Sequence, residues 1–288
     1  MGPQFKRSIV AIGTAVVIAT LWSATKSAVG QSPTAYKAPR TADGQANLNG
    51  IWQALNTANW DLEEHGAQPA PYQNLVGAYL AEPAGLSVVE GGTIPYKPEA
   101  LAKRKQNFET RLKPDPVKVD VADPEAKCFQ GGVPRGTYLP YPFQIFQTAN
   151  HILIAYEYAA SPRVIHLDKL DVDPLLFSGV DTWIGQSAGR WEGDTLVVDV
   201  TGFSGTVWLD RAGNFMSLTA HVVERYTPTG PDHLRYEATI TDPTTFTRPW
   251  KLSMPLYRRI EPNMQLLEFQ CIPFAEEFIY GKLKKPGR

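Results

Sequence analysis

Apolar and polar residues alternate along most of the second half of the chain. Alternation with a period of two places one row of side chains in a core and the other in solvent, so it predicts short β-strands. Turn signals such as Ala149-Asn150-His151 separate some of these runs and fit hairpins. Nine strands are predicted in this way: 143–148, 152–158, 162–167, 189–191, 195–201, 221–226, 234–240, 250–257 and 265–271.

The spacing of these strands predicts a mainly β fold. No long helix alternates with them, which argues against a parallel α/β sheet. Short connections after residue 189 favour an antiparallel meandering barrel of the lipocalin type, because closure leaves no exposed sheet edge. A barrel of about eight strands can hold one small ligand. A β-sandwich is the alternative, and a short C-terminal helix from about Phe274 to Lys284 is expected in either case.

The chain before residue 128 has a different pattern, with Pro, Gly and Ala punctuation and little alternation. Its clearest element is a basic helix over about 97–113, where Pro98 suits the first turn. We interpret its basic residues as a solvated face, although a membrane surface or an anionic partner would also suit a basic helix. We therefore divide the chain into an irregular N-terminal extension, 31–127, and an antiparallel β domain, 128–288.

Residues 1–30 have the layout of a secretory signal peptide. The basic pair Lys6-Arg7 precedes an apolar run over 9–22, and small residues lead up to Gly30, after which we expect cleavage. An uncleaved membrane anchor is the alternative, but the run is shorter than the ~20 residues that a spanning helix needs. No later segment predicts a membrane span, so we expect an exported protein, in the periplasm or outside the cell.

The composition is consistent with one large globular domain. The 288-residue chain has 28 Lys+Arg and 29 Asp+Glu, and loss of the signal segment, which carries three basic residues, takes the net charge from -1 to -4. This balance excludes a nucleic-acid binder that works through bulk basic charge. A hydrophobic content of 43% excludes a mostly disordered chain.

The chain has two cysteines, Cys128 and Cys271. An even count in an exported protein predicts a disulfide between them. A reactive thiol is the alternative, but Lys127 is the only neighbouring residue in sequence that would stabilise a thiolate.

Short motifs for catalysis or cofactors are absent from the sequence. It contains no GxGxxG, GxxxxGKS/T, HExxH, GxSxG or CxxC pattern. The five histidines, at 65, 151, 166, 221 and 233, have no spacing that would put two on one face of a local element. We therefore predict no cofactor and no metal site formed by residues close in sequence, although distant ligands can converge in space. We expect a small molecule as the partner.

Candidate catalytic residues lie in and near the strand 221–226. Glu224 shares its face with apolar residues, whereas His221 lies on the opposite face. Burial favours the neutral form of a carboxylic acid, a property of a general acid, and Tyr236 would reach Glu224 in one pairing register. Asp210, in a turn-rich loop, is the fourth candidate. The structural alternatives are an ion pair for Glu224, a surface position for His221 and a turn for Asp210.

Candidate ligand-binding residues come from other strands and loops. Arg163 could clamp an anion or a carboxylate. The aromatic residues Tyr156, Trp183 and Trp208 could line a pocket for a flat apolar or sugar ligand. The structural alternatives are a solvent-exposed cation at a strand end and ordinary core packing.

Several longer motifs are distinctive: Trp183-Ile-Gly-Gln-Ser-Ala-Gly-Arg-Trp-Glu-Gly-Asp-Thr-Leu-Val-Val-Asp199, His221-Val-Val-Glu-Arg-Tyr226 and Asp242-Pro-Thr-Thr-Phe-Thr-Arg-Pro-Trp250. Together with the segment 39–52, they resemble a large family of exported, uncharacterised bacterial proteins. The resemblance covers nearly the whole mature chain and implies an envelope or secreted protein, with no particular activity. The family pattern has a His-Ser pair where this chain has Met216-Ser217, so the resemblance supports no catalytic role for that loop.

Three functions fit these observations. The first is a barrel that binds a small apolar or aromatic ligand, and the second is an acid/base enzyme (a lyase, isomerase or hydrolase) acting on a small molecule or glycan at the barrel mouth. The third is an envelope scaffold without a ligand. Convergence of Glu224, His221, Arg163 and Asp210 in one pocket would favour the enzyme, whereas a barrel filled by side chains would favour the scaffold.

Overall fold

A computed structural model describes residues 36–69, 81–113, 121–167, 181–275, 279 and 282. The predicted signal peptide, 1–30, and most of the predicted C-terminal helix lie outside the described residues. Within the described part of the chain, no helix is both long and apolar enough to cross a bilayer.

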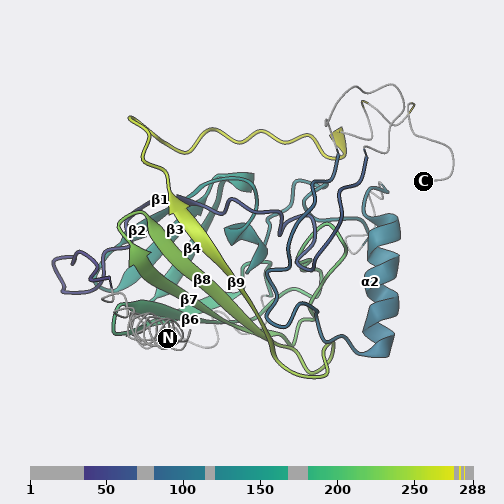
Figure 1. The fold of residues 1–288 in the computed structure, drawn as a ribbon, viewed down its shortest axis with the longest axis horizontal. Helices are drawn as coiled ribbons and strands as arrows, with labels where there is room; N and C mark the ends of the chain where they lie inside the picture. The colour runs from purple at the N-terminus through teal and green to yellow at the C-terminus, as the bar shows by residue number, and fades with distance from the viewer. Residues whose placement is uncertain are drawn as a thin grey trace, which may run out of the picture. The chain divides into compact units, whose positions relative to one another are not determined.

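Nine strands form a closed barrel, in which each strand pairs with its neighbours in sequence order and β1 pairs with β9 (Figure 1). The prediction of a β-barrel is therefore confirmed, and the sandwich alternative is wrong. The strands are β1 (Gly50–Gln53), β2 (Phe143–Gln147), β3 (His151–Tyr156), β4 (Ser161–His166), β5 (Gln186–Glu192), β6 (Thr195–Thr201), β7 (His221–Gly230), β8 (His233–Thr241) and β9 (Trp250–Arg258).

One pairing departs from the expected antiparallel order. Strands β4 and β5 are parallel, with Ile165 opposite Ser187 and His166 opposite Ala188, so the barrel is mixed. Parallel neighbours need a crossover of a dozen or more residues, and the chain over 167–185 is long enough to provide one. Alternation within each strand gives no information about this direction, which is why the sequence predicted a simple meander.

The barrel closes through a strand that the sequence did not predict. Strand β1 comes from the segment 31–127 that we had assigned to the extension, and its four residues are too few to show alternation. Its pairing with β9 occupies the second edge of β9, since β8 already occupies the first. Both edges of β9 are therefore paired, which leaves no edge for a further strand. Residues 265–271 form no strand, so the strand predicted there is wrong. The chain over 259–274, which we call the strap, forms no strand and is the yellow trace after β9 in Figure 1.

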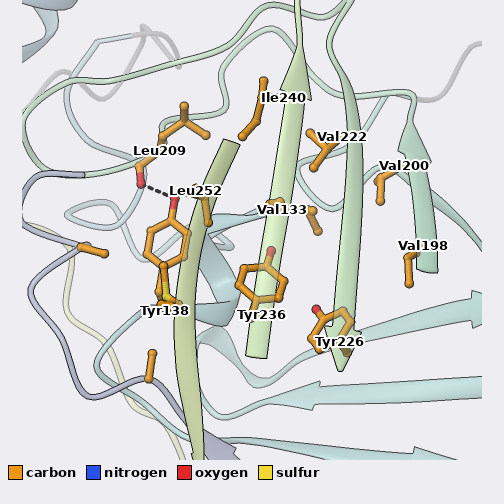
Figure 2. Close-up of a cluster of buried hydrophobic side chains, with 14 of the residues drawn as sticks. Val133, Tyr138, Val198, Val200, Leu209, Val222, Tyr226, Tyr236, Ile240 and Leu252 are labelled. Carbon is orange, nitrogen blue, oxygen red and sulfur yellow. Dashed lines mark hydrogen bonds between the residues drawn. The ribbon is translucent and has the colours of Figure 1, made fainter. Parts of the chain in front are cut away.

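Side chains fill the interior of the barrel. Val222, Glu224 and Tyr226 of β7 are buried and alternate with partly exposed neighbours, as the sequence predicted. Figure 2 shows Tyr226 and Tyr236 packed beside aliphatic residues of neighbouring strands. The interior of the barrel is therefore a packed core and not an open ligand cavity.

The predicted basic helix is present as α2 (Pro98–Thr110), and two short 3-10 turns, η1 (Arg135–Thr137) and η2 (Tyr158–Ala160), flank β2 and β3. Helix α2 packs against the loop that carries Asp210, where the Asn107 side-chain amide donates to the Gly213 carbonyl at 3.1 Å. Gly213 has φ +85°, and a Cβ there would lie 2.7 Å from the backbone of α2. Only glycine allows this close approach.

Candidate functional site

Two of the four predicted catalytic residues meet inside the barrel. Glu224 accepts hydrogen bonds from the hydroxyls of Tyr236 at 2.7 Å and Tyr226 at 3.0 Å, and its other oxygen pairs with Arg163. Tyr226 is directly opposite Tyr236, so Tyr236 reaches Glu224 along the diagonal of the β-ladder. The same register sets Arg225 opposite Glu237 on the other face of the two strands.

This interior network is closed to solvent. Arg163 and Glu224 expose no more than 1% of their surface, and Arg163 also donates to the Ser187 hydroxyl at 2.9 Å. Burial, followed by the charge of Glu224, raises the pKa of Tyr236 well above its usual value, so Tyr236 stays a neutral donor. Tyr156 is buried in the same region, and burial raises the pKa of its hydroxyl too. Glu224 therefore fits its structural alternative, an ion pair. Arg163 is buried inside the barrel, so its alternative, a solvent-exposed cation at a strand end, is wrong.

His221 lies on the outer face of the barrel, away from Glu224. Its Nε2 is 3.1 Å from a carboxylate oxygen of Asp199, and the His221 side chain is 43% exposed. Asp199 also pairs with Arg190 at the surface. The structure therefore places His221 on the face opposite Glu224, as the alternation predicted, and fits the surface position that was its structural alternative.

Asp210 organises a loop instead of facing a cavity. It is fully buried and accepts hydrogen bonds from the Leu62 amide at 2.9 Å, the Asn214 amide at 3.0 Å and the Asn214 side chain at 2.6 Å. Burial and the negative charge of Asp61 raise the pKa of Asp210 to about 7. These bonds tie the loop after β6 to the segment that contains Leu62.

The predicted aromatic ligand residues are part of the packing. Trp208 is buried, and its backbone forms an isolated antiparallel β-bridge with Phe215. Trp183 packs on Phe129, with ring centroids 5.1 Å apart. Together with Tyr156, these tryptophans fit the core alternative better than the ligand-lining one.

A pocket of about 300 Å³ lies beside the disulfide, and we call it the disulfide pocket. Five aromatic side chains line it: Trp60, Tyr141, Tyr158, Phe269 and Phe274. Of the residues predicted from the sequence as site residues, Cys271 is the one that lines this pocket. The volume is at the lower end of the range for small-molecule sites, and aromatic walls are typical of them.

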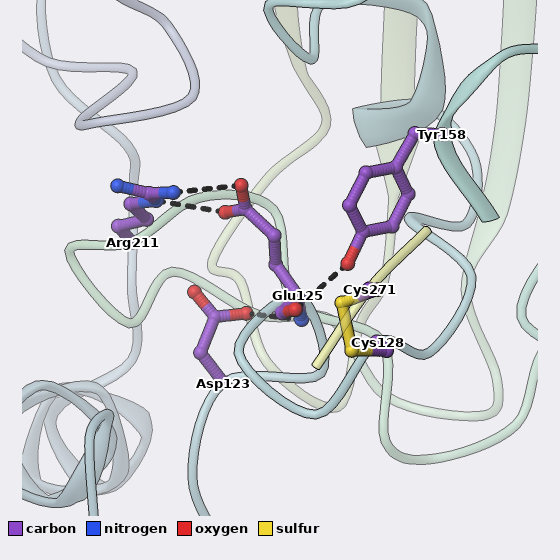
Figure 3. The surroundings of a disulfide bond; sticks show 6 residues. All are labelled: Asp123, Glu125, Cys128, Tyr158, Arg211 and Cys271. Atoms are coloured by element: carbon purple, nitrogen blue, oxygen red, sulfur yellow. Dashed lines mark hydrogen bonds and ion pairs between the residues drawn. A yellow bond between two sulfur atoms is a disulfide. The ribbon is translucent and has the colours of Figure 1, made fainter. Parts of the chain in front are cut away.

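A network of four charged residues lies at one side of the disulfide pocket, and three of them, Asp123, Glu125 and Arg211, line it. Arg135 is fully buried and donates to both oxygens of Asp123, at 2.6 and 2.9 Å, and to Glu125 at 2.7 Å. Arg211 holds Glu125 from the other side through two bonds of 2.8 Å, which Figure 3 shows. The guanidinium of Arg211 also stacks on the Trp60 ring at 4.3 Å. Two cations and two anions balance in this network. The other two charged lining residues, Arg111 and Glu82, pair with each other at 3.5 Å, so the pocket is polar without net charge.

The charge of Glu125 is fixed over the physiological pH range. Burial alone would raise the pKa of Glu125, but Arg211 and Arg135 outweigh it and lower that pKa to about 2. Glu125 therefore stays ionised, and it is too weak a base for proton transfer near neutral pH.

The disulfide holds the strap over the pocket. Cys128 and Cys271 are bonded, with Cα atoms 5.8 Å apart, which confirms the predicted pairing. Beside it the Phe274 amide donates to the Ala126 carbonyl at 2.8 Å. Phe269 of the strap packs on Tyr158, with ring centroids 4.6 Å apart. One wall of the pocket therefore depends on a segment that has no strand pairing of its own.

The sequence did not reveal Asp123, Glu125 and Arg135 as a unit. Their one local signal is the acidic pair around Pro124, just before Cys128. The ion network forms only when the η1 turn brings Arg135 back over these acids and the loop after β6 adds Arg211. Among the described residues, no group of three or more His, Cys, Asp or Glu side chains is arranged to hold a metal ion.

Fold and site together define a closed, mixed β-barrel with a packed interior and a ligand-sized aromatic pocket outside it. Comparisons with protein-family models, with curated proteins and with solved structures gave no match.

Proposed function

We propose that the protein binds a small apolar or aromatic molecule in the disulfide pocket. The observation that carries the proposal is the set of five aromatic side chains around a cavity of about 300 Å³. Aromatic rings offer large apolar contact area and stack on flat ligands. The neutral ion network supplies polar groups that would orient a ligand without selecting for a strong charge.

The location differs from the barrel interior that lipocalin-type binding would use. Inside the barrel, the inward positions of β7 and β8 hold the buried residues Val222, Tyr226 and Tyr236. A ligand in that space would have to displace this packed core, whose loss is costly. The disulfide pocket is a concave surface that requires no such displacement.

Binding is better supported than acid/base catalysis. Glu224 is sealed within the barrel, His221 is on the outer face, and Asp210 is bound by loop amides. These residues therefore lack the common pocket that an acid/base mechanism needs. Three carboxylates line the disulfide pocket, and each is paired with an arginine: Glu82 with Arg111, Asp123 with Arg135, and Glu125 with Arg135 and Arg211.

We further propose that the protein is exported to the bacterial periplasm or the cell exterior. A disulfide is a usual feature of proteins in oxidising compartments. The signal-peptide layout of residues 1–30 and the resemblance to exported bacterial proteins support the same location.

A fluorescence titration tests the binding proposal. The naphthalene probe ANS would be bound first and then displaced by indole, by phenol or by cyclohexanol as an aliphatic comparison. We expect saturable binding that Phe269→Ser abolishes, because this change removes a ring from the pocket wall. Phe146→Ser is the matched control, since Phe146 is 44% exposed on β2 and does not line the pocket.

Two results would contradict the proposal. If ANS and the three competitors fail to bind the folded protein, the scaffold function is favoured instead. If Phe146→Ser weakens binding as much as Phe269→Ser does, the bound probe is on another surface.

A further inference from the structure

Two histidines face each other across the ladder between β3 and β4. His151 is directly opposite His166, and their ring centroids are 5.1 Å apart with the planes at 73°. Fifteen positions separate them in the sequence, so local spacing could not reveal the pair.

Both imidazoles lie on the outer face of the barrel. Ile152 and Ile165, their chain neighbours, are fully buried, and alternation along each strand therefore turns His151 and His166 outward. Within the described part of the chain, neither ring makes a hydrogen bond or an ion pair. By contrast, His221 is paired with Asp199. The two rings are thus accessible and not committed to other partners.

The separation of the rings fits chelation of one ion. Zinc binds an imidazole nitrogen at about 2.0–2.1 Å and prefers a tetrahedral arrangement. Because the ring centroid lies roughly 1 Å behind the nitrogen, two imidazoles on one tetrahedral ion have centroids about 5 Å apart. The observed 5.1 Å is close to that value, so the two cross-strand rings already lie at a separation that suits one shared ion.

We propose that His151 and His166 form a two-histidine site for a divalent transition-metal ion such as Zn²⁺, with water in the remaining positions. Imidazole is a preferred ligand for zinc, copper and nickel. The site is independent of the disulfide pocket and involves none of its residues.

The position of the site suggests what the ion would do. His166 is the last residue of β4, and only it and Ile165 pair with β5, so this parallel seam is short. An ion bridging His151 and His166 would clip β4 to β3 beside that seam. Because a ligand that binds the folded state stabilises it, metal should raise the melting temperature.

The experiment is a calorimetric titration of the full chain, without a histidine tag, with ZnCl₂. We expect one ion per chain and a Zn²⁺-dependent rise in melting temperature. His151→Ala and His166→Ala should each weaken binding about tenfold or more, because each removes half of the protein ligands. Both side chains are outward-facing, so these variants should keep the wild-type circular dichroism spectrum.

His233→Ala is the matched control. His233 faces Tyr257 across β8 and β9 in the same edge-on geometry, with ring centroids 5.3 Å apart, but its partner has no ligating nitrogen. This variant should bind zinc as the wild type does. Absence of zinc binding by the wild type, retained affinity in His151→Ala or His166→Ala, or an equal loss in His233→Ala would each overturn the proposal.

Discussion

The substitution Glu224→Gln removes one charge from the buried pair in the barrel while keeping nearly the same shape. In the native protein Glu224 is fully buried and accepts from Arg163 and from two tyrosine hydroxyls. A glutamine has one acceptor oxygen and adds two N–H donors, so it cannot accept all three bonds. Arg163 would be left as a buried cation without a counterion.

The expected cost is large. Breaking a buried ion pair by removing one partner costs about 3–5 kcal/mol, because the remaining charge is desolvated and uncompensated. For domains of about 150–250 residues, each kcal/mol lowers the melting temperature by roughly 2–4 °C, so a fall of roughly 6–20 °C is expected. Tyr236→Phe removes one donor and leaves the ion pair in place, so its cost should be smaller, about 1.5–3 kcal/mol.

Urea denaturation and thermal melts, followed by circular dichroism, measure these differences. Glu237→Gln is the matched control, because Glu237 is on the next strand but pairs with Lys251 at the surface, 3.3 Å away. Such surface pairs contribute about 0–1 kcal/mol. The double variant Arg163→Met/Glu224→Leu should recover part of the stability lost in Glu224→Gln, since it leaves no unpaired charge, although the hydroxyls of Tyr226 and Tyr236 lose their acceptor. A Glu224→Gln protein within about 1 kcal/mol of the wild type would refute the view that this pair is buried and mutually dependent.

Three further predictions concern the disulfide pocket and its loops. Replacing Cys128 and Cys271 by serine should lower the free energy of unfolding by up to about 5 kcal/mol, because the disulfide closes a loop of 143 residues and so restricts the unfolded chain. The same change should weaken ANS binding. An unchanged urea midpoint and an unchanged ANS affinity would contradict these two expectations. Because the folded pKa of Asp210 is raised from 3.8 to about 7, the folded state holds a proton in that window that the unfolded state has lost, and stability should fall as pH rises across it. Asp210→Asn should flatten this part of the stability profile, and an identical slope in the variant would count against the raised pKa. Gly213→Ala should lower the melting temperature, because the φ of +85° at Gly213 and its close approach to α2 leave no room for a Cβ. An unchanged melting temperature would show that the loop can move away from α2.

Local sequence was enough to predict much of the fold. Alternation located β2 to β4 and β6 to β9, and it placed Glu224 and His221 on opposite faces because side-chain direction along a strand depends only on parity. It did not show which of the two faces points inward. Pro98 and the helical spacing after it predicted α2, whose hydrogen bonds join residues four apart. Two cysteines in a chain expected to be exported predicted the disulfide by count alone.

The candidate site could be predicted only in fragments. Trp60, Glu125, Arg211 and Phe269 belong to four separate stretches of the chain, and no spacing rule joins them. Asp210 was selected because its loop is rich in turn residues, and it proved to be an organiser of that loop. A charged residue in a loop has the same local sequence whether it faces a ligand or binds backbone amides.

The sequence by itself determined where most of the strands form, which side chains of a strand share one face, and where the basic helix lies. Tertiary structure alone decided that β4 runs parallel to β5, that β1 closes the barrel, and that Arg163 reaches Glu224 across 61 positions of sequence. It also decided that the barrel is filled, that the strap closes a pocket outside it, and that His151 faces His166. The physical reason is that strand formation and side-chain direction follow from neighbouring residues. Strand direction, register and long-range ion pairs instead depend on how the whole chain closes on itself.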